Sequence, residues 1–239
     1  MFLDQKCAYF VLCTPFLAIW ILLFFLANKE TRRHQILRSI VGIFLGIFFE
    51  TLYFSDYWFP QSVLFTSFFS IPVFIEDAIF GFSVAGIGST CYETLFSKKR
   101  TREKGISIVK KIFIAVTIGV VIYCFSLFLI ELIGINSIFA TALSMFLFSC
   151  AALTKRVDLI RPAILTGAIF LLLLFSIYSG GFLIFLNAEE ILKNWWMLYN
   201  HPMGVRIANV PLSEIIWAWS FGFASPTLYS GATGVHFKN

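Results

Sequence analysis

Long apolar stretches dominate the chain, and short polar or charged segments separate them. A helix that crosses a bilayer needs about 20 consecutive residues that are mostly apolar. The pattern therefore predicts an all-α integral membrane protein with about seven transmembrane helices. These apolar stretches cover residues 8–27, 36–55, 72–96, 108–130, 135–153, 163–186 and 211–234.

The composition agrees with this prediction. The chain has 239 residues, of which 59% are hydrophobic and 13% charged, whereas a soluble domain carries about 25% charged residues. No linker-like segment interrupts the sequence, so residues 1–239 are expected to form a single membrane domain. The first apolar stretch lacks a small-residue cleavage site and its basic cluster follows it, which favours a retained helix over a signal peptide.

Lysine and arginine are concentrated beside alternate ends of the expected helices, and this bias predicts the orientation. Cytoplasmic loops carry an excess of these residues, which places the N-terminus outside and the C-terminus inside, as expected in a prokaryotic plasma membrane. The net charge of +5 then reflects loops that face anionic lipid, and no nucleic-acid partner is needed. Fifteen of the 18 lysine and arginine residues are expected on the inner side. They are Lys29, Arg32, Arg33, Arg38, Lys98, Lys99, Arg100, Arg102, Lys104, Lys110, Lys111, Lys155, Arg156, Arg161 and Lys238.

The sequence has no motif typical of a metal or nucleotide site. Its five cysteines lie far apart without a C-x-x-C pair, and its three histidines are isolated. It contains no Gly-rich phosphate loop and no dinucleotide fingerprint. We therefore expect no metal site and no nucleotide cofactor.

A short internal repeat links the third and the last apolar stretches. D-A-I-F-G-F-S-V-A (77–85) aligns with E-I-I-W-A-W-S-F-G (214–222), so that an acid, an isoleucine, two aromatic residues and a serine coincide. These helices lie four spans apart and would cross the membrane in the same direction. The alignment predicts a parallel repeat with units at about 36–96 and 163–234.

Further positions extend the alignment. A tyrosine follows each acid by 15 positions, at Tyr92 and Tyr229, and a proline precedes each acid. Each copy also has a small-x-x-x-small pair, which lets helices approach closely in lipid. The two helices are therefore expected to be near neighbours, with Gly81/Ala85 and Ala218/Gly222 facing protein.

The acids of the repeat are candidates for chemistry. Proline favours the first turn of a helix, so Pro72 and Pro211 are expected to begin helices that carry Glu76, Asp77 and Glu214 at their outer ends. A carboxylate there gains only about 0.3–1 kcal/mol from the helix dipole. Because apolar sequence follows these acids and no basic partner is near, a functional role is favoured over capping. Burial would keep one acid protonated, as a general acid requires.

Glu50 is predicted to reach the same depth. It lies 14 residues beyond Ile36, or about 21 Å along a helix that runs from the inside to the outside. This position is in the outer half of the membrane. Three helices would thus bring carboxyl groups to one level, although an interfacial Glu50 that extends outward is the simpler alternative.

Aromatic residues flank the acids of both copies. Phe80 and Trp217 lie three residues beyond Asp77 and Glu214, on the same helix face. Phe82 and Trp219 follow two positions later. An aromatic face stabilises a nearby cation, so acids beside aromatic walls suit the protonation of an alkene. Lipid-facing aromatic residues without a catalytic role are the alternative.

The segments S-I-P-V-F-I-E-D-A-I-F-G-F and N-V-P-L-S-E-I-I-W-A-W-S-F-G resemble the Pro-acid motifs of the membrane-integral, flavin-independent lycopene cyclases. The resemblance covers about 55–96 and 195–234. It implies a cofactor-independent isomerase that cyclises an acyclic end of lycopene or a similar lipophilic polyene. It also implies that Glu76, Asp77 and Glu214 are catalytic. In this chain the acids stand farther from the proline than in the family's usual motif.

Two other classes share some of these features. A retinal-binding seven-helix protein would need a lysine in its last helix, and there is none between Pro211 and Gly234. A proton-coupled transporter, or a non-catalytic carotenoid or lipid binder, also fits intramembrane acids and parallel repeats. The scarcity of polar residues in the apolar stretches argues against a polar solute. The oligomeric state is left open.

Overall fold

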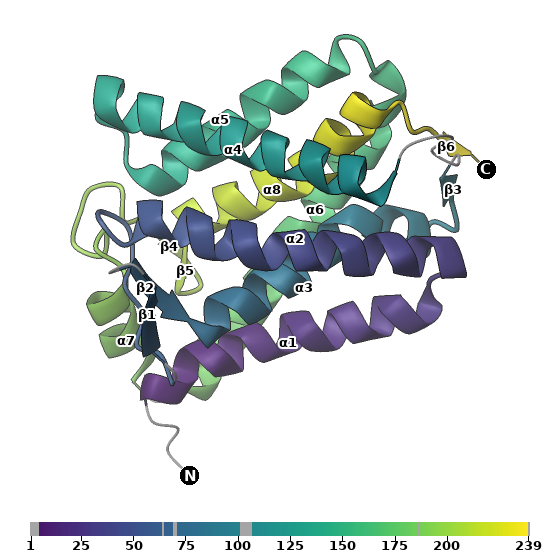
Figure 1. Cartoon of the computed structure of the whole chain (residues 1–239). Coiled ribbons are helices and arrows are strands. Elements are labelled where there is room, and N and C mark those ends of the chain that lie inside the picture. Colours follow the sequence, from purple (N-terminus) through teal and green to yellow (C-terminus); the bar gives the residue numbers. More distant parts are fainter. Residues whose placement is uncertain (1–4, 64, 69–70, 101–106, 186, 239) are drawn as a thin grey trace.

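The computed structural model describes residues 5–63, 65–68, 71–100, 107–185 and 187–238. It is a helical bundle with short strands at its two ends (Figure 1). The α-helices are α1 (Gln5–Leu26), α2 (Lys29–Tyr53), α3 (Ile75–Leu95), α4 (Ile108–Ile133), α5 (Ser137–Leu153), α6 (Ile160–Ile184), α7 (Ala188–Trp195) and α8 (Leu212–Thr233), and the 3-10 helix η1 (Val157–Leu159) precedes α6. The strands are β1 (Phe65–Phe68), β2 (Ile71–Phe74), β3 (Lys99–Arg100), β4 (Arg206–Ile207), β5 (Val210–Pro211) and β6 (Phe237–Lys238).

Each of the seven apolar stretches contains one long helix, so the expected helices are confirmed. In the described part of the chain, four helical segments are long and apolar enough to cross a membrane, and α5 is a shorter apolar helix. These four segments support membrane insertion. They are Cys7–Leu26, Lys29–Tyr53, Ile108–Ile133 and Val157–Ile184. The count of seven spans and the orientation stay predictions.

The helices pack as two triplets joined by one helix. α3 packs most extensively on α2 and next on α1, whereas α8 packs most extensively on α6 and next on α5. α4 connects the triplets and touches α5, α2 and α8. α3 and α8 both run from the end with the β1–β2 and β4–β5 hairpins to the end where β3 pairs with β6 (Figure 1). They are therefore parallel neighbours, as the repeat predicts.

Small residues allow the closest helix contacts, but the small pairs of the repeat do not pack α3 against α8. A side chain at Gly42 of α2 would collide with the backbone of Gly81 and with Ala85 of α3. In the other triplet, a side chain at Gly222 of α8 would lie 2.7 Å from the Thr166 oxygen of α6. Gly81 and Ala85 thus pack on α2, Gly222 packs on α6, and Ala218 is fully buried, so all four small positions of the repeat face protein.

Pro72 and Pro211 were expected to begin α3 and α8, and this expectation is wrong for Pro72, whereas Pro211 directly precedes α8. Pro72 lies inside β2, where it pairs with Ser67, and α3 begins three residues later. Pro211 lies in β5 and occupies the N-cap position of α8. A two-stranded hairpin consists of edge strands, which tolerate a residue without an N–H donor. The hairpins and α7 are elements that apolar periodicity did not reveal.

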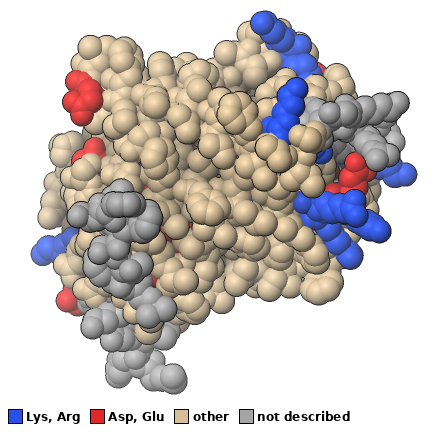
Figure 2. Space-filling view, viewed as in Figure 1, with Lys and Arg blue, Asp and Glu red and all other residues tan. Residues whose placement is uncertain are grey.

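Charged side chains are distributed as a membrane protein requires. Figure 2 shows a broad band of uncharged residues across the visible face, with most of the lysine and arginine at the end where β3 and β6 lie. Arg102 and Lys104 of the basic cluster lie outside the described residues. The basic residues thus gather at one end of the bundle, in agreement with the sequence bias.

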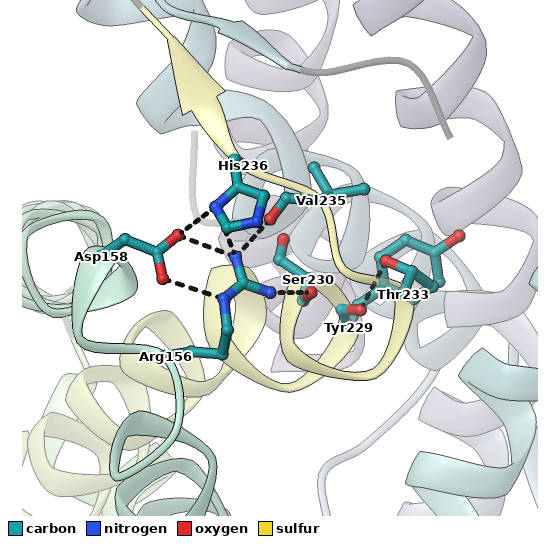
Figure 3. A network of polar contacts seen from close by, with 7 residues as sticks. All are labelled: Arg156, Asp158, Tyr229, Ser230, Thr233, Val235 and His236. Atoms are coloured by element: carbon teal, nitrogen blue, oxygen red, sulfur yellow. Dashed lines mark hydrogen bonds and ion pairs between the residues drawn. The ribbon is translucent and has the colours of Figure 1, made fainter. Parts of the chain in front are cut away.

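Arg156 holds the end of α8 against the α5–α6 connection (Figure 3). Its guanidinium donates to both carboxyl oxygens of Asp158, at 2.9 and 2.8 Å, and to the backbone oxygens of Ser230 and Val235. His236 Nδ1 lies 2.9 Å from the same carboxylate. Because the last carbonyl groups of a helix lack partners within the helix, Arg156 acts as a cap for α8.

We expect Gly42→Ala to destabilise the bundle by about 1–3 kcal/mol, because the added methyl group overpacks the contact between α2 and α3. Gly180→Ala is the matched control. Gly180 is also helical, but a side chain there would meet nothing within 4 Å. Thermal unfolding of the purified protein in detergent measures both effects. Equal stability of the two variants would contradict the close packing of α2 on α3.

Candidate active site

Four buried acids lie at the hairpin end of the bundle. Glu50 is near the C-terminal end of α2, Glu76 and Asp77 are in the first turn of α3, and Glu214 is in the first turn of α8. Each is at most 6% exposed. The sequence prediction that Glu50 shares the level of the other acids is therefore confirmed.

Glu214 accepts hydrogen bonds at one carboxyl oxygen. The Tyr57 hydroxyl donates to Oε1 over 2.7 Å, and the Trp196 indole Nε1 donates to the same oxygen over 3.3 Å. Trp196 Nε1 also lies 3.0 Å from the Tyr57 hydroxyl, and Ser213 Oγ lies 3.0 Å from that hydroxyl. Within the described part of the chain, Glu214 Oε2 accepts no hydrogen bond. The donors thus orient the carboxyl group through one oxygen only.

Glu50 is held in a similar way from the first triplet. The Trp58 indole Nε1 donates to Glu50 Oε2 over 2.9 Å, and among the described residues Oε1 has no such donor. Trp58 and Trp196 also form a β-bridge, and their rings lie 5.5 Å apart. The indole group that donates to Glu50 and the one that donates to Glu214 are therefore neighbours.

The two acids of α3 differ in what they contact. The Tyr9 hydroxyl of α1 donates to Asp77 Oδ1 over 2.7 Å, and Asp77 interacts electrostatically with Glu50. Glu76 instead accepts from Ser62 Oγ, over 2.6 Å, and from the Val63 backbone N–H, over 2.9 Å. The structure thus brings Asp77 close to Glu50, whereas Glu76 fixes the segment that leads to β1.

A long apolar cavity approaches these acids from within the bundle. This main cavity has a volume of about 220 Å³ and lies among α2, α3, α4, α5 and α8. Its middle is walled by small and aliphatic side chains that include Gly46, Val84, Ala115, Gly119 and Met145. Its end nearest the hairpins reaches Glu50, Tyr53, Phe80 and Trp217.

A smaller pocket of about 30 Å³, the acid pocket, adjoins this end and shares those four residues with the main cavity. Glu50 and Glu214 both line the acid pocket, whereas Asp77 and Glu76 line neither space. A linear apolar group in the main cavity would therefore end beside two carboxyl groups. The residues that line the acid pocket are Tyr9, Glu50, Tyr53, Tyr57, Trp58, Phe80, Ile138, Tyr178, Glu214 and Trp217.

The aromatic candidates divide by helix face. Phe80 and Trp217 line both spaces, and their rings lie 5.9 Å apart. Phe82 instead packs on Trp20 of α1, at 4.8 Å, and Trp219 packs over Gly167 of α6. Residues five positions beyond an acid lie on a different helix face from those three positions beyond it. Phe82 and Trp219 were thus placed wrongly at the site.

Several residues at the site were not singled out as site candidates. Tyr9 and Tyr178 come from the ends of α1 and α6 that lie near the hairpins, and Trp196 follows α7 directly. Tyr57 and Trp58 follow α2, within the Y-W-F-P segment (57–60). Burial raises the pKa of Tyr57 well above its ordinary value, and Glu214 adds to the shift. Tyr57 therefore stays a neutral hydrogen-bond donor.

Within the described residues, no group of three or more His, Cys, Asp or Glu side chains could hold a metal ion. The side-chain donors to Glu50, Asp77 and Glu214 are phenol hydroxyl and indole N–H groups. Such donors orient a carboxyl group without adding charge. The site is thus a cluster of carboxyl groups in an aromatic, largely apolar surrounding within a helical membrane bundle.

The comparison with known families agrees with this description. Residues 136–232 match the model of the lycopene cyclase family, and this match supports the assignment of the protein to that family. The matched segment extends from the start of α5 through most of α8 and contains Glu214, Trp196 and Trp217. No curated protein and no solved structure matches the chain. The match thus supports the resemblance seen in the sequence and covers the second of its two segments.

Tyr57→Phe removes one of the two donors to Glu214 inside the bundle. We expect it to destabilise the protein by about 1–3 kcal/mol, because a buried carboxyl oxygen loses a partner. Tyr199→Phe is the matched control, since the Tyr199 hydroxyl donates to Glu189 over 2.8 Å at the surface. An exposed bond of this kind contributes little. If Tyr199→Phe lowered the melting temperature as much as Tyr57→Phe, the stabilising role of the buried Tyr57–Glu214 hydrogen bond would be contradicted.

Proposed function

We propose that the protein is a carotenoid cyclase that closes a ring at an acyclic end of a lycopene-type polyene inside the membrane. The observation that carries this proposal is the position of Glu50 and Glu214 in one acid pocket at the end of a long apolar cavity. The lycopene cyclase match over residues 136–232 supports the same class of activity. The substrate would be lipophilic, and the reaction would be a redox-neutral isomerisation.

The main cavity would hold the polyene and exclude water from its reacting end. Its glycine and aliphatic walls leave a narrow space without competing hydrogen-bond donors in its middle. A terminal isopropylidene group would then enter the acid pocket between Phe80 and Trp217. Exclusion of water matters because a tertiary carbocation reacts readily with it.

Glu50 would supply the proton. A carboxylate is stabilised by each hydrogen-bond donor that faces it, and Glu50 has one such donor whereas Glu214 has two. Glu50 also interacts with both Asp77 and Glu214, and several negative charges at close range in an apolar surrounding are unfavourable. Glu50, which has fewer donors, is therefore assigned as the proton donor, with Oε1 carrying the proton.

Ring closure would follow from this protonation. Addition of the proton to the terminal double bond leaves a tertiary cation, and the C5=C6 double bond attacks it to close a six-membered ring. The faces of Trp217 and Phe80 would stabilise the positive charge as it moves into the ring. Trp217 is itself oriented, because its indole Nε1 donates to the Tyr53 hydroxyl over 3.2 Å.

Glu214 would then remove a proton from the ring cation through Oε2. Tyr57 and Trp196 stabilise its carboxylate form through Oε1 and leave the other oxygen toward the pocket. One proton is added and one is lost, so the product is an isomer of the substrate. Asp77 would act through its proximity to Glu50, and Glu76 would keep the segment before β1 in place.

These roles predict different outcomes for two isosteric variants. Glu50→Gln removes the proton donor, so we expect cyclisation to fall about 100-fold or more with the substrate left unchanged. Glu214→Gln keeps the donor but removes the base. We expect a similar loss of the normal product, together with alternative rings or alcohols formed when the cation is captured by water. Pigment analysis of membranes from lycopene-accumulating bacteria that express each variant measures both results.

Glu131→Gln is the control for this pair. Glu131 lies at the outer end of α4 and is exposed, so its substitution should leave the pigments unchanged. Protein level and melting temperature are compared in parallel. Normal cyclisation by a folded Glu50→Gln or Glu214→Gln variant would remove that residue from the mechanism. If Glu50→Gln instead gave the alternative rings or alcohols, Glu50 would be the base and Glu214 the proton donor.

A further inference from the structure

The start of α5 is tied to the segment that carries two of the hydrogen-bond donors. Asp56 directly precedes the tyrosine and the tryptophan that donate to Glu214 and Glu50. Its carboxylate accepts hydrogen bonds from the backbone N–H of Ser137, over 2.9 Å, and from the Ser137 hydroxyl. The Asn136 side chain in turn donates to the Asp56 backbone oxygen over 2.7 Å. The same segment thus orients both acids and fixes the point at which α5 begins.

One face of α5 lines the two ligand spaces. Ile138 lines the acid pocket, and Thr141 and Met145 line the main cavity. Residues at positions i, i+3 and i+7 lie on the same side of a helix. All three side chains are buried. The fixed start of α5 therefore holds Ile138 at the end of this face where the acids lie.

Ile138 differs chemically from the other walls of the acid pocket. Among the described residues that line this pocket it is the one aliphatic residue, and the others are acids or aromatic residues. An aromatic face stabilises a nearby cation, and a carboxyl group transfers a proton. An isoleucine side chain does neither, so it contributes only its shape. Its branch at Cβ also restricts its rotamers, which makes this wall stiff.

The last step of the proposed reaction has more than one outcome, and the orientation of the ring decides among them. The ring cation carries its charge at C5, and hydrogen atoms on C4, on C6 and on the C5 methyl group are adjacent to that charge. When one of these C–H bonds breaks, the proton passes to Glu214 Oε2 and the electron pair forms the new double bond. The three positions give three ring isomers. The product therefore depends on which hydrogen faces Glu214.

We infer that Ile138 determines the position of the ring double bond, as the wall that holds the ring cation in one orientation against Glu214. This inference rests on the proposed cyclase function and assigns a specificity-determining residue to the same site. The acid pocket, at about 30 Å³, is much smaller than the main cavity of about 220 Å³ that it adjoins. A ring that forms in the acid pocket would therefore contact its walls. Space created at Ile138 would let the cation turn before the proton is removed.

Isomer analysis of the cyclised products from Ile138→Val and Ile138→Ala tests this inference. The full-length variants are expressed in lycopene-accumulating bacteria, and the ring isomers are separated by chromatography and assigned by NMR spectroscopy. One methylene group in a close-fitting apolar pocket changes selectivity by about tenfold or more. We therefore expect the ratio of the main isomer to the others to fall about tenfold in Ile138→Val and further in Ile138→Ala. The ratio does not depend on the amount of folded protein, so a loss of stability alone leaves it unchanged.

Ile87→Val and Ile87→Ala are the matched controls. Ile87 of α3 is also a buried isoleucine, but it lines neither the acid pocket nor the main cavity. These variants should lower the melting temperature to a similar extent and leave the isomer ratio unchanged. An equal change of the ratio in the Ile87 variants would show that loosened packing alone alters the product, and the role of Ile138 would be overturned.

The same cultures separate this inference from the proposed function. Cyclised products with one isomer ratio in the parent protein and in both Ile138 variants would overturn the inference alone, because the cyclase would be active without control by this residue. If the folded parent protein gave no cyclised product, the cyclase function itself would be contradicted, and the role of Ile138 would be rejected with it.

Discussion

The burial of carboxyl groups in an apolar interior is the constraint on which the rest of the structure depends. A buried acid is costly unless hydrogen-bond donors accompany it. Here the donors are Tyr9, Tyr57, Trp58 and Trp196, and they come from α1 and from the segments between the long helices. The connections at the hairpin end therefore serve the site directly, because they carry the donors that make burial of the acids tolerable.

The topology explains how two similar triplets form one site. A unit of three helices that starts on one side of a membrane ends on the other side. A second unit in the same orientation can therefore follow only after the chain has crossed the membrane once more. α4 supplies that return, and it also forms a wall of the main cavity through Ala115, Ile118, Gly119 and Ile122. The acid pocket then lies between the triplets, with Glu50 from one and Glu214 from the other. A site of this kind needs both units, although the family match covers only the second of them.

Much of the fold follows from the sequence, because apolar length and small-residue spacing act locally. The seven long helices, the parallel direction of α3 and α8, and the common level of Glu50, Asp77 and Glu214 were predicted in this way. The hairpins were missed because Pro72 was taken as a helix start, whereas it lies in a strand. The separation of Phe82 and Trp219 from the site follows from helix rotation, which the repeat alignment alone did not take into account.

The hydrogen-bond donors could not be assigned from the sequence, since their positions depend on contacts over long separations. Tyr57 and Glu214 are 157 residues apart, and Tyr9 and Asp77 are 68 apart. Tyr57 and Trp58 stand shortly before a proline, and nothing local in the sequence connects them to particular acids. Only the packing of α1, α2 and α8 around the acid pocket reveals which tyrosine or tryptophan serves which carboxyl group.

Cyclisation of lycopene by the purified protein in deuterated water tests the central claim most directly. If one carboxyl group donates a solvent-exchangeable proton and another removes a different proton, each ring formed must gain one deuterium. Mass spectrometry of the product should show a mass increase of one unit per ring, and recovered lycopene should show none. A cyclised product without deuterium would contradict the proton-initiated mechanism, and the absence of any cyclised product from the folded protein would contradict the proposed function.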